Sequence, residues 1–148
     1  TRVSDDRYVM AIAKDNPLTR KAYSKPGFAH LFLDPALAAE QQFILAHPQQ
    51  RVRQISDRIL RHAGIVPKIR LETSSIQSAL CFASNDLGIT FAPESYIPLF
   101  NAQKELAYFY LEDKYEAFWT FCVVYPQNVT PSTPARFFLQ ETQRLFGR

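Results

Sequence analysis

Short apolar runs alternate with amphipathic segments along most of this chain. Two apolar runs, at residues 8–13 and 42–46, have the length of β-strands and are bounded by turn residues, and a third strand is predicted at residues 67–72, where apolar and polar residues alternate. Between the second run and this third strand, residues 51–63 place apolar side chains on one helical face and arginines on the other. This pattern predicts two strands, a helix that ends before Gly64, and a third strand.

The second half of the chain begins with a helix signal. Ser74 and Gln77 form a capping-box pattern, which predicts a helix over residues 75–86 with Ser74 as its N-cap. Three more short strands are expected, at residues 89–92, 107–111 and 117–125.

A last helix is expected at the end of the chain. Thr133 is predicted to cap it, with Pro134 at its first position, and the helix to run over residues 134–146. Its inward-facing side chains are predicted to be Phe138, Leu145 and Phe146. Strands of about five residues that alternate with helices of about twelve predict an α/β fold with a mostly parallel sheet.

Composition narrows the class of protein. The 148 residues are 47% hydrophobic and 14% aromatic, which excludes a disordered chain, and no apolar run is long enough to span a membrane. The net charge of +3 is scattered, whereas a DNA-binding surface needs clustered cations, so these residues are not expected to bind nucleic acid themselves. Cys81 and Cys122 lie in apolar stretches and are predicted to be buried, reduced thiols.

Motifs for catalysis are absent from the sequence. There is no G-x-S-x-G elbow, no phosphate-binding glycine loop, and no C-x-x-C or H-x-x-x-H spacing. His30, His47 and His62 are too far apart to form a local metal motif. We therefore predict no catalytic residues, no metal and no cofactor, and we do not expect an enzyme.

Two polar turns are the most informative candidates for a binding site. Pro48-Gln49-Gln50 and Thr73-Ser74-Ser75 each join the end of a predicted strand to the start of a predicted helix. In open α/β sheets, ligands lie beyond the carboxyl ends of strands, where helix N-termini present free N–H groups. Neither turn carries a carboxylate, which suits a small anionic or polar ligand. Plain helix capping by Ser74 explains the second turn equally well.

Three segments resemble a known family. Residues 63–69 (AGIVPKI), 72–75 (ETSS) and 84–95 (SNDLGITFAPES) closely resemble the effector-binding domain of LysR-type transcriptional regulators. Residues 14–18 (KDNPL) are similar to another family motif, with Asn16 in place of its histidine, and Asp86 stands where the family has glycine. The resemblance implies a periplasmic-binding-protein type II-like fold, with one complete subdomain and part of a second.

The resemblance also implies a domain division. Residues 16–117 would form subdomain II, and residues 1–15 and 118–148 the remaining parts of subdomain I. The DNA-binding helix-turn-helix of the family, its linker helix and the first half of subdomain I have no counterpart in these residues. Apolar surface is therefore expected to be exposed where subdomain I is incomplete, around Tyr8, Met10, Ile12, Phe121 and Val123.

The family holds a small effector in the cleft between its subdomains. Transferred by position, the cleft would be lined by three groups of residues: His47, Pro48, Gln49 and Gln50; Thr73, Ser74 and Ser75; and Trp119 or Thr120. The resemblance implies a cytoplasmic ligand-sensing domain for a carboxylate effector. It implies a homo-dimer or tetramer that contacts DNA only through the missing N-terminal domain and has no membrane contact. The alternative is a periplasmic solute-binding protein of the same fold, which the full-length N-terminus would distinguish.

Overall fold

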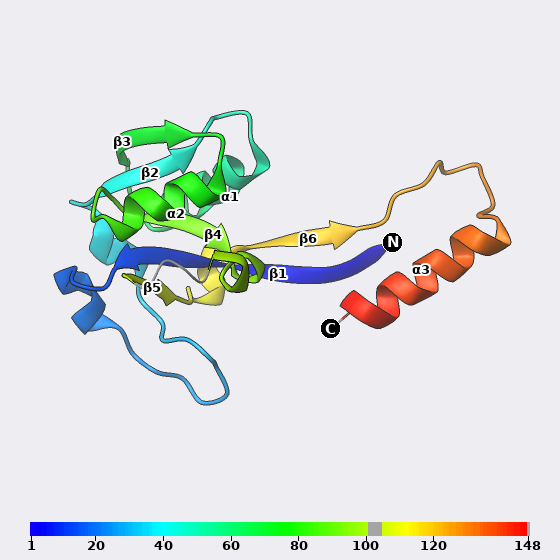
Figure 1. Ribbon diagram of the computed structural model, residues 1–148, viewed down its shortest axis with the longest axis horizontal. Helices are drawn as coiled ribbons and strands as arrows, with labels where there is room; N and C mark the ends of the chain where they lie inside the picture. The colour runs from blue at the N-terminus through cyan, green and yellow to red at the C-terminus, as the bar shows by residue number, and fades with distance from the viewer. Residues whose placement is uncertain (101–104, 148) are drawn as a thin grey trace.

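The computed structural model describes residues 1–100 and 105–147 (Figure 1). Its helices are α1 (Arg51–His62), α2 (Ile76–Ser84) and α3 (Thr133–Phe146). Its strands are β1 (Arg2–Ala13), β2 (Gln42–Ala46), β3 (Lys68–Thr73), β4 (Thr90–Pro93), β5 (Leu106–Phe109) and β6 (Phe118–Cys122). Every predicted helix and strand is therefore present, with boundaries shifted by a few residues at most except at β1 and β6.

The long strand β1 organises the sheet. It pairs antiparallel with β4 and β5 along residues 8–13 and antiparallel with β6 along residues 2–7. Strands β2 and β3 are parallel, and β2 joins the β4 side through the Ile44 N–H, which donates to the Ile89 carbonyl at 2.9 Å. The α/β class is confirmed. The mostly parallel sheet is not confirmed, because β1 is antiparallel to all three strands that pair with it, β4, β5 and β6.

Helices α1 and α2 cover opposite faces of this sheet. Ile55, Ile59 and Leu60 of α1 pack with Met10 and Ile12 in one buried cluster. On the other face, α2 packs Leu80 and Ala83 against Ala11 and Ile44. Alternate residues of β1 thus enter two cores, as the two-residue repeat of a strand requires.

Burial corrects one expectation about exposed apolar surface. Tyr8, Met10 and Ile12 are at most 1% exposed because α1 lies over them, so the prediction that they are exposed is wrong. Phe121, on β6, is 48% exposed, as predicted. On β1 and β6, exposed apolar side chains therefore occur beyond the sheet, in the two-stranded ribbon that residues 2–7 of β1 form with β6.

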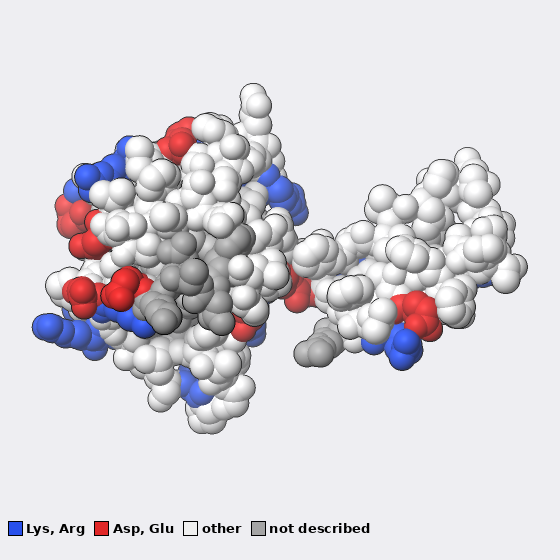
Figure 2. Space-filling view, viewed as in Figure 1, with Lys and Arg blue, Asp and Glu red and all other residues white. Residues whose placement is uncertain are grey.

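The two ends of the chain lie together. The N-terminal amine donates to the Val123 carbonyl at 2.7 Å, and α3 lies beside the far end of the β1–β6 ribbon (Figure 1). Few charged groups cover this part in the view of Figure 2. Ser132, rather than the predicted Thr133, caps α3, and its hydroxyl accepts the Ala135 N–H. The apolar residues predicted to face inward are instead exposed, by 63%, 58% and 62%: Phe138, Leu145 and Phe146.

The cysteine prediction is wrong on burial. Cys81 and Cys122 are both free thiols, as expected, but both are exposed. Cys81 lies on the outer face of α2, and Cys122 lies on the open ribbon rather than in the sheet. Among residues 1–100 and 105–147, no helix has the length and apolarity needed to cross a bilayer.

Candidate functional site

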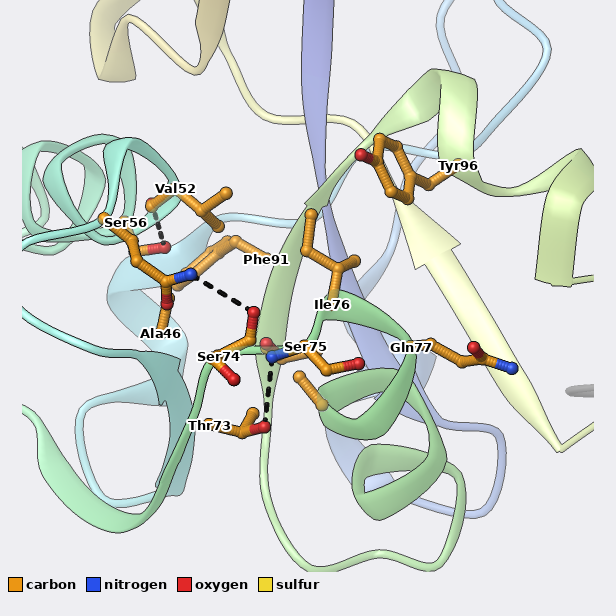
Figure 3. A pocket seen from close by; sticks show the side chains of 13 residues that line it. Ala46, Val52, Ser56, Thr73, Ser74, Ser75, Ile76, Gln77, Phe91 and Tyr96 are labelled. Carbon is orange, nitrogen blue, oxygen red and sulfur yellow. Dashed lines mark hydrogen bonds between the residues drawn. The ribbon is translucent and has the colours of Figure 1, made fainter.

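The two polar turns meet at one cavity of about 400 Å³ (Figure 3). Strand β2 ends at Ala46 and strand β3 at Thr73, and α1 and α2 start directly after the two turns. Val52 and Ser56 of α1 lie on one side of the cavity and Tyr96 on the other. The remaining lining residues are Ala46, Gln50, Thr73, Ser74, Ser75, Ile76, Gln77, Ala79, Thr90 and Phe91.

Gln50 ties the two turns together. Its Oε1 accepts the His47 N–H at 3.1 Å, and its Nε2 donates to the Ser74 carbonyl at 3.2 Å. His47, Pro48 and Gln49 are exposed on the turn and do not line the cavity. Of the first predicted wall, the structure therefore places only Gln50 at the cavity.

The second turn lines the cavity with all three of its predicted residues, but their roles differ from the prediction. Ser75, not Ser74, is the N-cap of α2, and its hydroxyl accepts the Ser78 N–H at 3.1 Å. The Thr73 hydroxyl accepts the Ser75 N–H at 3.2 Å, which sets Ser75 in the extended conformation that a cap needs. The capping-box prediction placed the helix start one residue too early. The Ser74 side chain is exposed and makes no hydrogen bond within the described residues.

We expect Ser75→Ala to lower the free energy of unfolding by about 1 kcal/mol, because it removes the cap of α2. Ser74→Ala is the matched control and should change stability by less than about 0.5 kcal/mol, as for an exposed residue without partners. Urea unfolding of both variants, without ligand, measures this difference. Equal losses in the two variants would contradict the assignment of Ser75 as the cap.

The hydrogen bonds leave mostly donors facing the cavity. Ser75 and Thr73 use their oxygens to accept backbone N–H groups, so their hydroxyl protons remain free to donate. Gln50 uses its oxygen and one amide hydrogen, which leaves a second amide hydrogen. Ile76 and Gln77 lie in the first turn of α2, where backbone N–H groups have no partner within the helix. Such a site is complementary to a ligand group that accepts hydrogen bonds.

Arg53 joins α1 to the ends of the two strands that lead into the site. Its side chain is 11% exposed, and it donates to the Ala46 carbonyl at 2.8 Å, to Asp57 at 2.8 Å and to Glu72 at 3.3 Å. Burial opposes its charged form, but the hydrogen bonds and charges of Asp57 and Glu72 outweigh burial and raise the pKa of Arg53. The ends of β2 and β3 are thereby held to α1 by one cation.

Trp119 and Thr120 are not brought to this cavity. Both lie on β6, where the Trp119 indole N–H donates to Asp6 at 3.2 Å and the Thr120 hydroxyl donates to Asp5 at 2.6 Å. The Trp119 ring meets the Tyr8 ring edge to face, with centroids 5.4 Å apart. Burial, and then the charge of Asp6, raise the pKa of the Tyr8 phenol. These residues form a separate cluster at the junction of the sheet and the ribbon.

Several lining residues were missed by the sequence analysis. Ser56 interrupts the apolar face of α1, and this single polar position was a usable signal. Thr90 and Tyr96 gave no signal, because Thr90 on β4 and Tyr96 in the short 3₁₀ helix after β4 reach the cavity only through the pairing of β4 with β1. No cluster of three His, Cys, Asp or Glu side chains suited to a metal occurs in the described ranges.

A sheet covered on both faces by helices, with an uncharged polar cavity at its strand ends, is the architecture of a small-molecule binding domain. The sequence matches the family of LysR substrate binding domains over residues 1–147. The chain belongs to this family. A search of curated proteins found no match.

Solved structures support this fold. The effector-binding domain of QuiR in complex with shikimate is similar at a TM-score of 0.73 and 17% identity, over 98% of this chain and 63% of that one. The regulatory domain of CcmR from Synechocystis PCC6803, in complex with 2-PG, gives 0.74 and 14%, over 99% and 65%. The BenM effector-binding domain with benzoate gives 0.66 and 23%, over 98% and 61%. The chain thus spans about three-fifths of the length of these domains.

Proposed function

We propose that this chain is a ligand-sensing part of a LysR-type transcription regulator and that it binds a small carboxylate effector at Gln50 and Thr73–Ser75. The observation that carries the proposal is the surplus of donors at the cavity, together with the absence of any charged residue among the described residues that line it. A carboxylate accepts several hydrogen bonds and donates none, so it matches this surplus.

Energies favour hydrogen bonds over helix dipoles as the main source of affinity. Each helix N-terminus contributes about 0.3–1 kcal/mol toward an anion. Each hydrogen bond to a charged group contributes about 1.5–3 kcal/mol, so two or three such bonds outweigh both dipoles. The geometry of hydroxyl and amide donors should therefore set selectivity, while the dipoles favour negative charge.

Two alternatives are weaker. Helix capping explains only the acceptor side of Ser75 and Thr73, and it leaves their protons and the second amide hydrogen of Gln50 unused. The family match favours a regulator over a periplasmic solute-binding protein. Shikimate and benzoate, each bound by a structural relative, are both carboxylates, which supports the proposed ligand class.

The domain division is part of the proposal. Residues 16–117 form subdomain II, and residues 1–15 and 118–148 are the remaining parts of subdomain I. The exposed apolar face of α3 and the pairing of β1 with β6 support this division. In the intact cytoplasmic protein, a separate domain would contact DNA, and the effector would change the arrangement of a homo-dimer or tetramer.

Titration calorimetry with benzoate and shikimate tests the ligand site, with benzamide as the uncharged control. We expect the acids to bind and the amide not to bind. Ser74→Ala should weaken acid binding about tenfold, because it removes a donor that no structural hydrogen bond uses. Unfolding measurements should show unchanged stability for this variant. Failure of both acids to bind, or equal binding of benzamide, would contradict the proposal.

A further inference from the structure

One wall of the cavity is formed by a very short helix. Tyr96 ends the 3₁₀ helix η3 (Glu94–Tyr96), which follows β4, and lies across the cavity from Val52 and Ser56 (Figure 3). A single 3₁₀ turn has poor hydrogen-bond geometry and is not stable by itself. The position of Tyr96 at the cavity therefore depends on contacts that other elements make with η3.

Asp6 of β1 caps this helix from a distant part of the chain. The N-cap residue of η3 is Pro93, which makes no side-chain capping hydrogen bond because its side chain has no polar atom. Asp6 supplies the acceptor instead. The Ser95 N–H donates to its Oδ1 at 3.3 Å, and the Ser95 hydroxyl donates to its Oδ2 at 2.6 Å. A residue 89 positions away in the sequence thus fixes the residue directly before Tyr96.

The same carboxylate also contacts the ribbon. The Trp119 indole N–H donates to Oδ2 of Asp6 at 3.2 Å, so its two oxygens accept hydrogen bonds from both η3 and β6. An ionised carboxylate accepts at both oxygens, whereas an asparagine amide would turn an NH₂ group toward one set of donors. Aspartate is depleted in strands, so strand propensity does not explain this residue type on β1. The donors of Ser95 and Trp119 do explain it.

We propose that Asp6 is a positioning residue of the ligand site, which holds Tyr96 in the cavity wall by capping η3. The inference rests on the proposed function, because its effect is on the affinity for the acids bound there. Tyr96 lines the cavity, and Asp6 is not among the described residues that line it. Without the cap, η3 frays and the Tyr96 ring leaves the wall, although the donors at Thr73–Ser75 stay in place.

Calorimetry with benzoate and shikimate tests the role of the cap. Asp6→Asn and Ser95→Ala should each weaken the binding of an acid that the wild type binds, by about fivefold, because the acid loses its contact with the Tyr96 ring. Ser95→Thr keeps both donors and should retain the wild-type affinity. In the absence of ligand, NMR should show that the Ser95 amide of Asp6→Asn exchanges its hydrogen about tenfold faster than in the wild type.

Asp5→Asn is the matched control. It removes the same charge from the neighbouring position on β1, but Asp5 accepts hydrogen bonds from Arg2 and Thr120 and none from η3 among the described residues. Its affinity for the acids should equal that of the wild type. An equal loss in Asp5→Asn and Asp6→Asn would show that charge, and not the cap, determines the affinity, and would overturn the inference.

A double-mutant cycle tests whether Asp6 acts through Tyr96. Tyr96→Ala should weaken acid binding about fivefold. Adding Asp6→Asn to Tyr96→Ala should cost no further affinity, because no ring remains to be positioned. A general structural defect in Asp6→Asn would instead add its effect to that of Tyr96→Ala.

The outcomes separate this inference from the proposed function. If an acid binds and Asp6→Asn leaves its affinity unchanged, or if the effects of Asp6→Asn and Tyr96→Ala add, the inference is wrong while the carboxylate site stands. If neither acid binds to the wild type, the proposed function fails and this inference fails with it.

Discussion

Phe43→Ala is expected to lower the free energy of unfolding by about 3–5 kcal/mol. Phe43 is 1% exposed on β2 and stacks on Phe91 with ring centroids 6.2 Å apart. Removing it leaves a cavity between β2 and β4 beneath the candidate site, and the flanking strand pairing prevents collapse into the space. Urea unfolding, followed by circular dichroism, measures the loss.

Phe137→Ala is the matched control for Phe43→Ala. Phe137 is 64% exposed on α3, so its truncation should change stability by less than about 0.5 kcal/mol. A large effect at Phe137 would mean that α3 is packed in solution by a partner such as a second copy. A small effect at Phe43 would contradict the described core.

Arg53→Met is expected to cost about 1.5–3 kcal/mol of stability and to weaken carboxylate binding. Methionine keeps much of the buried stem but loses the donors that hold the Ala46 carbonyl and Glu72 to α1. Both strand ends at the site should then become less fixed. Unfolding and calorimetry on the same variant measure the two effects.

Arg51→Met separates the role of Arg53 from the loss of a positive charge. Arg51 is exposed on the same helix, and among the described residues its guanidinium donates only to Gln54, at 3.3 Å. Its replacement should leave stability within about 0.5 kcal/mol. If both variants reduced binding equally, general charge rather than the placement of the strand ends would explain the effect.

The order of elements could be predicted from the sequence because local signals agree with the fold. The run at 42–46 and the apolar spacing of residues 51–63 correspond closely to β2 and α1, and Gly64 takes the expected left-handed conformation at φ 70°. The direction of β1 could not be predicted, because periodicity carries no information on which strands become neighbours. The turn at Thr73–Ser75 lines the cavity, but α2 begins one residue later than predicted, so Ser75 and not Ser74 caps it.

The exposure of side chains and the placement of strand residues at the cavity could not be predicted from the sequence. The apolar face of α3 has a helical repeat whether or not another surface covers it, so Phe138 and Phe146 were assigned to a core that the described chain does not provide. The sequence does not distinguish Thr90 from any other strand threonine. Only the packing of β4 against β1 and α2 places it at the cavity. Residues that depend on long-range pairing are therefore the ones that only the structure identifies.

The chain contains a single tryptophan, and its position gives the molecule a built-in optical probe. Trp119 lies at the junction of sheet and ribbon, where its indole is hydrogen-bonded to Asp6 and touches the rings of Tyr8 and Phe121. Any rotation of the ribbon relative to the sheet changes the polarity around this indole and hence its emission wavelength. A change in the arrangement of sheet and ribbon can thus be followed by intrinsic fluorescence, without an attached dye.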